Sequence, residues 1–357
     1  MRKHFLDNIR WATVLLVIVY HVFYLYNAQG IFGGIGPFQE EQPWEVFCTV
    51  VYPWFMVLLY VVAGASARYA LEKQSPRQFL KSKVHRLLVP STLGLTLLPA
   101  LSGYTYIRMG GAAEMIPGFL IYPISMVSGI GPLWFLHLLF LFSWILSGLV
   151  KCSWWEKLYA LGEKAALPVL VGLALPIWGA AQILNMPVIT TYRFGIYFLA
   201  YLLGYLVFSH EAVQQRLKQH CLPLLAGAVV CGTVYVWRFQ GQVYCDDPVL
   251  RHGLTNLYLW LAVLAIFGCG KAWCDRTGKL SGYLAKSSFG VYIVHYGITL
   301  CLCLWLRETG LPVAVIYGLA SLLSILGSIG AHAVLRRIPL ARYVIFGYRE
   351  EEKRVLR

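Results

Sequence analysis

The chain is short of charge, and the charge it has is mostly of one sign. Only 13% of its 357 residues are Asp, Glu, Lys or Arg, and 30 basic residues outnumber 16 acidic ones. Hydrophobic residues make up 59% of the chain, more apolar surface than the core of one water-soluble domain can hide. The excess must face lipid, so the composition excludes an ordinary soluble protein.

Paired cysteines and soluble insertions are also missing. The nine cysteines are scattered without metal-ligand spacing, so we interpret them as small apolar residues and expect neither a disulfide framework nor a metal site. No linker or long polar insertion divides the chain, which predicts a single membrane domain over residues 1–357 without a fused soluble domain. The start of the chain is basic, but no small-residue cleavage site follows, so we expect the first apolar run to be a transmembrane helix.

What the chain does contain is apolar runs of membrane length. A helix needs roughly 17 to 25 apolar residues to cross a hydrocarbon core of about 30 Å. Runs that meet or approach this length occupy residues 11–26, 46–66, 87–107, 132–150, 165–184, 194–208, 222–237, 254–270, 287–306 and 312–335. The sequence therefore predicts an all-α integral membrane protein with about ten transmembrane helices.

The basic residues lie almost entirely on one side of these runs. Segments of one face hold all the Lys and Arg residues except Arg108, Arg193, Arg238, Arg251 and Arg307. Cytosolic segments of membrane proteins are enriched in Lys and Arg, so the basic face is predicted to be cytosolic, with both termini on that side. The basic excess thus reports topology, and we reject nucleic acid as a partner.

An ionisable residue at bilayer depth is costly and commonly functional. His21 lies ten residues beyond the start of the first run, roughly 15 Å deep. Arg10 precedes it on the same helix face, about 16 Å away, and Asp7 lies near that face. Arg10 could hold an anionic donor at the cytosolic mouth, and the His21 imidazole could accept a proton from a hydroxyl. The alternative is an interfacial anchor and a histidine that hydrogen-bonds a neighbouring helix.

A second basic segment, residues 77–86, immediately precedes the third run. Lys83 and Arg86 are three residues apart and would point together at the membrane boundary if the helix begins before them. Two such cations are suited to clamp the phosphates of a nucleotide-bearing donor such as coenzyme A. On charge alone, contact with anionic lipid headgroups is the simpler alternative.

Further polar residues fall within the later runs. Ser288, Tyr292 and His295 follow one another at i, i+4 and i+7, on one face of the ninth run. His137 lies a few residues from the outer end of the fourth run. Such residues either line the cavity of His21 or join helices by hydrogen bonds. We favour cavity lining for His295 and helix contact for Ser288.

At these residues the chain resembles a known family, the membrane acyltransferases of acyltransferase family 3, over nearly its whole length. Arg10 and His21, with ten residues between them, match the family's signature of a basic residue and a histidine in the first span. Lys83-Val84-His85-Arg86 is similar to the family's basic pair, although its first member is often Arg. Residues 288–295 resemble the family's late segment that ends in Tyr and His.

Other stretches resemble one branch of this family. Residues 67–90, together with Pro132-Leu133-Trp134-Phe135-Leu136, are similar to the branch that contains the succinyltransferase of periplasmic glucans. This resemblance implies a multi-pass enzyme of the plasma or inner membrane with a carbohydrate or glycolipid acceptor. It implies acyl-coenzyme A as a co-substrate, an acyl group of the acetyl or succinyl type, and no tightly bound cofactor.

The family resemblance also implies roles for individual residues. Arg10, Lys83 and Arg86 would hold the phosphates of the donor, and His21 would be the general base, assisted by Arg10. Trp134, Tyr292 and His295 are candidates by location for stabilising the oxyanion. The sequence does not determine the acyl group, the acceptor, a covalent intermediate or the oligomeric state.

The main alternative function is a secondary transporter, or a lipid or glycan flippase, that uses intramembrane His and Arg residues. Many such proteins consist of two repeated halves with matching broken helices. We see no clear internal repeat in this chain, which favours the acyltransferase.

Overall fold

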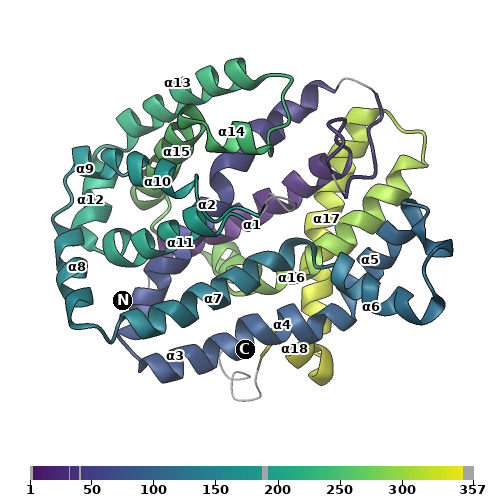
Figure 1. Cartoon of the computed structure of the whole chain (residues 1–357), viewed down its shortest axis with the longest axis horizontal. Helices are drawn as coiled ribbons and strands as arrows, with labels where there is room; N and C mark the ends of the chain where they lie inside the picture. The colour runs from purple at the N-terminus through teal and green to yellow at the C-terminus, as the bar shows by residue number, and fades with distance from the viewer. Residues whose placement is uncertain (1–2, 32, 40–41, 187–191, 349–357) are drawn as a thin grey trace. The chain divides into compact units, whose positions relative to one another are not determined.

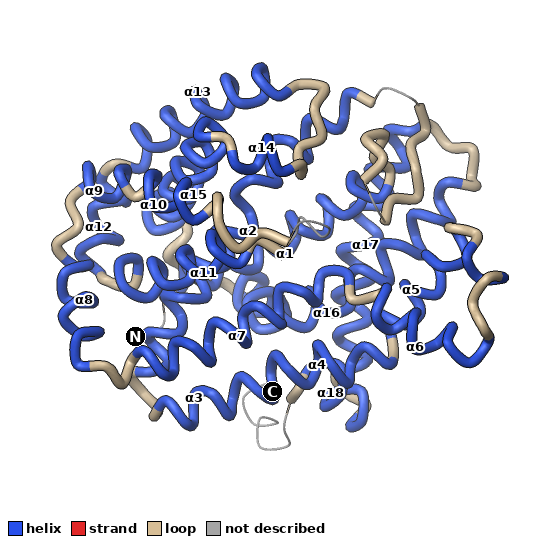
Figure 2. The backbone as a smooth tube through the Cα atoms, viewed as in Figure 1, coloured by secondary structure: helices blue, strands red, loops and turns tan. Residues whose placement is uncertain are grey.

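The chain is almost entirely helical. The computed structural model describes residues 3–31, 33–39, 42–186 and 192–348, and Figures 1 and 2 show helices joined by loops. Within these ranges no strand forms a sheet, and Asn185 and Arg193 make an isolated bridge. The predicted all-α class is therefore confirmed. The terminal residues 1–2 and 349–357 lie outside the described residues, and the cytosolic location of both termini stays a prediction.

The described chain folds into two compact units built from interleaved segments. The first unit comprises Met1–Thr13, Val46–Leu80 and Phe142–Ala285, and the second comprises Val14–Glu45, Lys81–Leu141 and Lys286–Arg357. Each unit is described by itself below. The prediction of a single membrane domain stays a prediction.

Seven helices within the described residues are long and apolar enough to cross a membrane. They are α1 (His4–Leu25), η1 with α2 (Pro43–Leu71), η5 with α7 (Gly131–Leu149), α13 (Cys221–Phe239), α15 (Gly253–Trp273), α16 (Lys279–Arg307) and α17 (Val313–Leu335). Each coincides with one of the ten predicted runs. Length and composition therefore identified these helices correctly.

The remaining three predicted spans belong to bent pairs of helices, and the bend falls within the run 87–107, at the start of the run 165–184 and beyond the end of the run 194–208. Between Pro76 and Met109 the axis bends by 48°, through α3 (Pro76–Lys83), η2 (Val84–Leu88), α4 (Val89–Thr92), η3 (Leu93–Thr96) and α5 (Leu98–Met109). The bend is 117° between α8 (Ser153–Glu163) and the helices α9 (Leu167–Gly172) and α10 (Ala174–Ala180). It is 96° between α11 (Phe194–Leu203) with η6 (Gly204–Phe208) and α12 (Glu211–Gln219). If each bent pair is one span, the count rises to ten.

Proline explains where two of these breaks fall. Pro99 and Pro168 each stand in the first turn of the helix that follows the break, where a missing backbone N–H costs nothing. A further apolar helix, α6 (Gly118–Ser128), lies between the third and fourth predicted runs. Its 11 residues are too few to cross a bilayer.

In the first unit, glycines bring the backbones of α2 and α11–η6 into contact. A Cβ atom at Gly64 would lie 1.9 Å from the carbonyl oxygen of Tyr201, and one at Gly204 would lie 2.2 Å from that of Val61. No side chain fits at either position. Small residues allow such close packing of transmembrane helices, which have no hydrophobic effect to draw them together.

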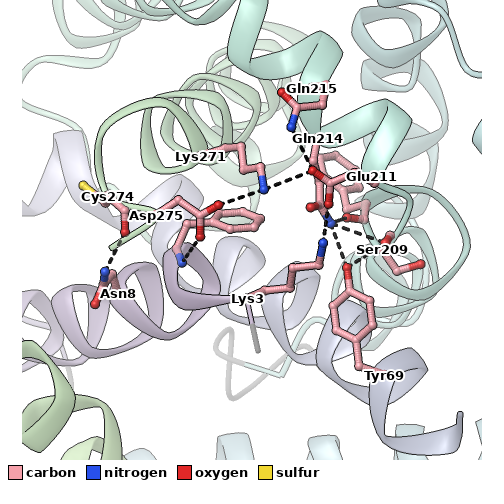
Figure 3. Close-up of polar contacts among 12 residues, drawn as sticks. Lys3, Asn8, Tyr69, Ser209, Glu211, Gln214, Gln215, Lys271, Cys274 and Asp275 are labelled. Atoms are coloured by element: carbon pink, nitrogen blue, oxygen red, sulfur yellow. Dashed lines mark hydrogen bonds and ion pairs between the residues drawn. The ribbon is translucent and has the colours of Figure 1, made fainter. Parts of the chain in front are cut away.

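The start of α1 is anchored within the first unit by a polar cluster, shown in Figure 3. Lys3 pairs with Glu211 at the start of α12. The buried Lys271 places its Nζ 3.1 Å from Glu211 Oε1 and 2.8 Å from Asp275 Oδ2. The backbone N–H of Phe5 donates to Asp275 at 3.2 Å. Two lysines and two carboxylates therefore join α1, α12 and the segment that follows α15.

These contacts favour the ionised carboxylates. Partial burial by itself raises the pKa of Glu211, but hydrogen bonds from Lys3, Gln215 and Lys271 outweigh it and lower that pKa to about 2. Burial opposes ionisation of Asp275 as well, and the hydrogen bonds from Lys271 and the Phe5 N–H bring its pKa below the ordinary value.

Gly64→Ala is expected to destabilise the protein because its new methyl group would force α2 away from Tyr201. Overpacking of this kind costs about 1–3 kcal/mol. The matched control is Gly227→Ala on α13, where a Cβ meets nothing within 4 Å and the substitution should stabilise the helix by roughly 0.5–1 kcal/mol. Thermal melting of the detergent-purified variants measures both changes. An unchanged Tm for Gly64→Ala would contradict the close approach.

Acidification is expected to weaken the anchor of α1. Because the folded pKa of Glu211 lies below its ordinary value of 4.5, its stabilisation is complete above that value and is lost as the pH falls toward about 2. Glu211→Gln cannot ionise, so its Tm should lie below that of the wild type at pH 7, and the gap should narrow by pH 3. The control Glu308→Gln alters an exposed carboxylate at the end of α16. If the gap for Glu211→Gln stays constant over this pH range, the ion pairs do not stabilise the fold.

Candidate functional site

Two histidines that are 274 positions apart in the sequence meet inside the second unit. His21 lies on α1 and His295 on α16, and the Nε2 atom of His295 is 3.3 Å from the Nδ1 atom of His21. Their ring centroids are 5.0 Å apart. His295 is fully buried, whereas His21 is half-buried. The sequence singled out both residues, and the structure brings them together.

The backbone partners of the two rings define their tautomers. His21 Nδ1 lies 2.7 Å from the carbonyl oxygen of Val17, and His295 Nδ1 is hydrogen-bonded to the carbonyl oxygen of Tyr292. A carbonyl only accepts, so in the neutral rings we assign the proton to Nδ1 of each histidine. His21 Nδ1–H then points at Val17 and at the lone pair of His295 Nε2. The lone pair of His21 Nε2 remains available as a base.

The ring of His21 is surrounded by aromatic side chains. The ring centroid of Tyr296 is 5.0 Å away, that of Tyr20 is 5.3 Å away and that of Tyr24 is 6.0 Å away. The hydroxyl of Tyr296 is hydrogen-bonded to that of Tyr106 on α5. Sequence reasoning missed Tyr106 and Tyr296, although Tyr296 directly follows His295. The signal that could have identified Tyr296 is its hydroxyl, which lies on the same helical turn as the predicted site residue His295.

Two other predicted polar residues bind the backbone of neighbouring helices. The hydroxyl of Tyr292 donates to the carbonyl oxygen of Pro132 at the start of the fourth span. His137 Nε2 lies 2.6 Å from the carbonyl oxygen of Ser91 on α4. These contacts are the interhelical hydrogen bonds that the sequence left as an alternative to cavity lining. Ser288 is buried on α16, and Trp134 is half-buried with its ring edge against Phe135.

Arg10 and Asp7 form an ion pair on α1, within the first unit. The side chain of Arg10 is 39% exposed and that of Asp7 is 12% exposed. The guanidinium is thus partly exposed beside its carboxylate partner. The same helix continues to His21, 11 residues further on.

The predicted basic pair lies at a change of helical geometry in the second unit. Lys83 ends α3, and Arg86 lies within η2, which is a turn of π-helix. A π turn is wider than an α turn, so the two cations are further apart around the axis than an α-helix would place them. Arg86 is exposed and Lys83 is half-buried. Single π turns occur often at functional sites.

The C-terminal helix of the second unit packs against this π turn. α18 (Pro339–Phe346) ends at Gly347, whose φ of 65° is in the left-handed region. A Cβ at Gly347 would lie 1.8 Å from the carbonyl oxygen of His85. The ring of Tyr343 is 6.4 Å from that of His85. Gly347 thus lets the chain contact the backbone beside Arg86.

No group of three or more His, Cys, Asp or Glu side chains that could hold a metal ion occurs among the described residues. The nine cysteines all lie in described segments and are free thiols.

Comparison with known proteins places the chain in a family. Residues 3–333 match the model of the family described as the acyltransferase domain. The chain is 22% identical to the glucans biosynthesis protein C of Escherichia coli O139:H28, over 97% of this chain and 94% of that protein. It is 20% identical to the protein of the same name from Salmonella schwarzengrund, over 97% of this chain and 95% of that protein. No solved structure matches the chain. Because the family model covers most of its length, the chain belongs to acyltransferase family 3 and is a multi-pass membrane acyltransferase.

Proposed function

We propose that the protein transfers an acyl group of the acetyl or succinyl type from cytosolic acyl-coenzyme A to a hydroxyl of an extracytoplasmic carbohydrate. The proposal places the enzyme in the bacterial inner membrane, with its basic segments in the cytosol. Relatives named glucans biosynthesis protein C support a glucan or a similar polymer as the acceptor. The observation that carries the proposal is the His21–His295 pair.

The pair prepares His21 to act as a general base. Val17 and His295 both accept from the Nδ1–H group of His21, which keeps the proton on Nδ1 and the lone pair on Nε2. When Nε2 takes a proton, the same two acceptors stabilise the resulting imidazolium. His295 is held in place through its own bond to the Tyr292 carbonyl oxygen and acts on His21 as a positioning residue.

The proposed reaction conserves charge and protons. The acceptor oxygen attacks the thioester carbonyl, and its proton passes to His21 Nε2. The carbon–sulfur bond of the tetrahedral intermediate then breaks while His21 returns the proton to the departing thiolate. An ester and coenzyme A are formed, and His21 regains its neutral form.

The donor would bind from the cytosolic side. Its phosphates carry charge that Arg86 can meet as an exposed cation, with Lys83 three residues earlier in the same basic segment. The acyl end must then extend toward His21, which lies roughly 15 Å into the bilayer. The acceptor would reach His21 from the opposite face, so neither substrate has to cross the membrane.

His21→Ala is expected to abolish acyl transfer but to retain donor binding, because a general base contributes about 10²- to 10⁴-fold to the rate. The measurement is release of free coenzyme A thiol by proteoliposomes that are supplied with acyl-coenzyme A and a glucan oligosaccharide.

The matched control for this experiment is His220→Ala. Like His21, His220 directs Nδ1 at the carbonyl oxygen four residues earlier, but it lies at the end of α12. That variant should retain wild-type turnover. Transfer by His21→Ala at a rate within tenfold of the wild type would exclude His21 as the base. If the wild type binds no acyl-coenzyme A at all, the donor assignment is wrong and transport assays should follow.

Arg86→Ala is expected to raise the KM for acyl-coenzyme A by about 10- to 100-fold, the loss of one charge-assisted hydrogen bond to phosphate. The kcat should change little, since Arg86 lies far from the reacting carbonyl in this proposal. Arg77→Ala removes the same charge from an exposed position on α3 and serves as the control. Equal KM values for the two variants would show that the basic segment contributes only general surface charge.

A further inference from the structure

The hydroxyls of Tyr106 and Tyr296 meet beside His21 without contacting the backbone. They hydrogen-bond each other, and neither hydroxyl makes another hydrogen bond within the described part of the chain. Neighbouring tyrosines behave differently. Tyr26 donates to the carbonyl oxygen of Cys303 at 2.7 Å, and Tyr292 donates to that of Pro132. Those two hydroxyls are used to join segments of the second unit.

A count of hydroxyl hydrogens shows that one donor of this pair is not used. Two phenols carry two hydroxyl hydrogens, and one bond between them uses only one. The second hydrogen has no acceptor among the described residues, and the lone pairs of the oxygen that donates are also unused. A polar hydrogen without an acceptor is unfavourable in an apolar environment. An oxygen acceptor from outside the described chain would complete the pair.

The packing around Tyr296 and Tyr106 determines where the O–H group without an acceptor lies. The ring of Tyr296 stands edge-to-face with that of His21, at a centroid distance of 5.0 Å. Gly131, with a φ of 44°, brings the start of the fourth span against the same ring, since a Cβ there would lie 3.0 Å from it. Tyr106 packs against a buried cluster that includes Val22 and Leu300. These residues belong to the turns that follow His21 on α1 and Tyr296 on α16.

Those turns lead to the segments that the positive-inside rule assigns to the outer face. The hydroxyl pair therefore lies on the side of His21 from which the acceptor approaches. In the described part of the chain the rings that contact His21 belong to Tyr20, Tyr24, Tyr296 and His295, and none of them carries a permanent charge. A neutral donor flanked by aromatic rings suits an alcohol of a sugar, which accepts and donates hydrogen bonds and has apolar C–H faces.

We propose that Tyr106 and Tyr296 form the acceptor subsite, in which their spare O–H group holds a carbohydrate oxygen next to the hydroxyl that attacks the donor. This inference rests on the proposed function. It adds to that function the residues that recognise the acceptor and its chemistry, an uncharged polyol. Holding a neighbouring oxygen would orient the attacking hydroxyl toward His21 Nε2.

The test compares Tyr106→Phe, Tyr296→Phe and the double variant in proteoliposomes with saturating acyl-coenzyme A and a short linear glucan oligosaccharide. Each single variant keeps one hydroxyl with a free hydrogen, so its acceptor KM should rise only a few fold. The double variant has no such donor, and its acceptor KM should rise by about tenfold or more, beyond the product of the single effects. The KM for acyl-coenzyme A should stay at the wild-type value.

Tyr26→Phe is the matched control. It removes a hydroxyl whose hydrogen is already bound to Cys303, so it should lower the Tm while the acceptor KM stays unchanged. Binding of the same oligosaccharide to the protein in nanodiscs, measured by saturation-transfer NMR, reports acceptor recognition without turnover. The double variant should lose this signal, and His21→Ala should keep it.

The outcomes separate this inference from the proposed function. An unchanged acceptor KM and binding signal in the double variant would overturn the subsite, even when transfer depends on His21. A fall in kcat at constant acceptor KM would also overturn it, because the hydroxyls would then act on the transition state rather than on the bound acceptor. If transfer does not depend on His21 but the NMR signal is lost in the double variant, the proposed base is wrong while the carbohydrate subsite stands.

Discussion

A histidine at bilayer depth has to satisfy a ring N–H within the protein, because hydrocarbon offers no hydrogen-bond partner. His21 and His295 both do so with carbonyl oxygens of their own helices, three or four residues earlier. That choice fixes both tautomers and leaves each Nε2 as an acceptor. α1 and α16 then approach until one ring can accept from the other at 3.3 Å. The contacts of Tyr292 with Pro132 and of Tyr296 with Gly131 bring the fourth span against the same face of α16.

Hydropathy predicted the unbroken spans because transfer of an apolar run into lipid depends on its length and composition alone. It could not predict where a helix bends. Pro99 and Pro168 stand at breaks, yet Pro53 lies inside α2, which continues through it to Leu71. In the sequence, all three are prolines within apolar stretches, and nothing distinguishes the two cases. Whether it ends a helix depends on which neighbouring groups satisfy the freed carbonyl, and that is a property of the packed structure.

The residues of the candidate site likewise include some that the sequence could predict and some that it could not. His21 and His295 could be predicted because an ionisable group in an apolar run is costly wherever its neighbours lie. Tyr106 and Tyr296 could not, since a phenol in such a run is unremarkable until its hydroxyl meets another one 190 positions away. The spacing of Lys83 and Arg86 was visible in the sequence, but the π turn that separates them was not. The sequence thus identified individual residues that are costly in an apolar environment, whereas only the structure showed which residues lie next to each other.

The neutrality of the groups around His21 bears on the kind of chemistry that the second unit can perform. Among the described residues, the polar contacts of His21 are with the Val17 carbonyl oxygen and with His295, and no carboxylate pairs with its ring to stabilise a lasting imidazolium. Such a charge is costly in an apolar environment, so a proton that His21 accepts has to leave soon after. Transfer from a thioester to an alcohol provides that exit, because the departing thiolate takes up the proton that the alcohol gives. A carrier that moves a proton between the two faces must instead hold it through a change of conformation. The arrangement of His21 is better suited to passing a proton on than to storing it.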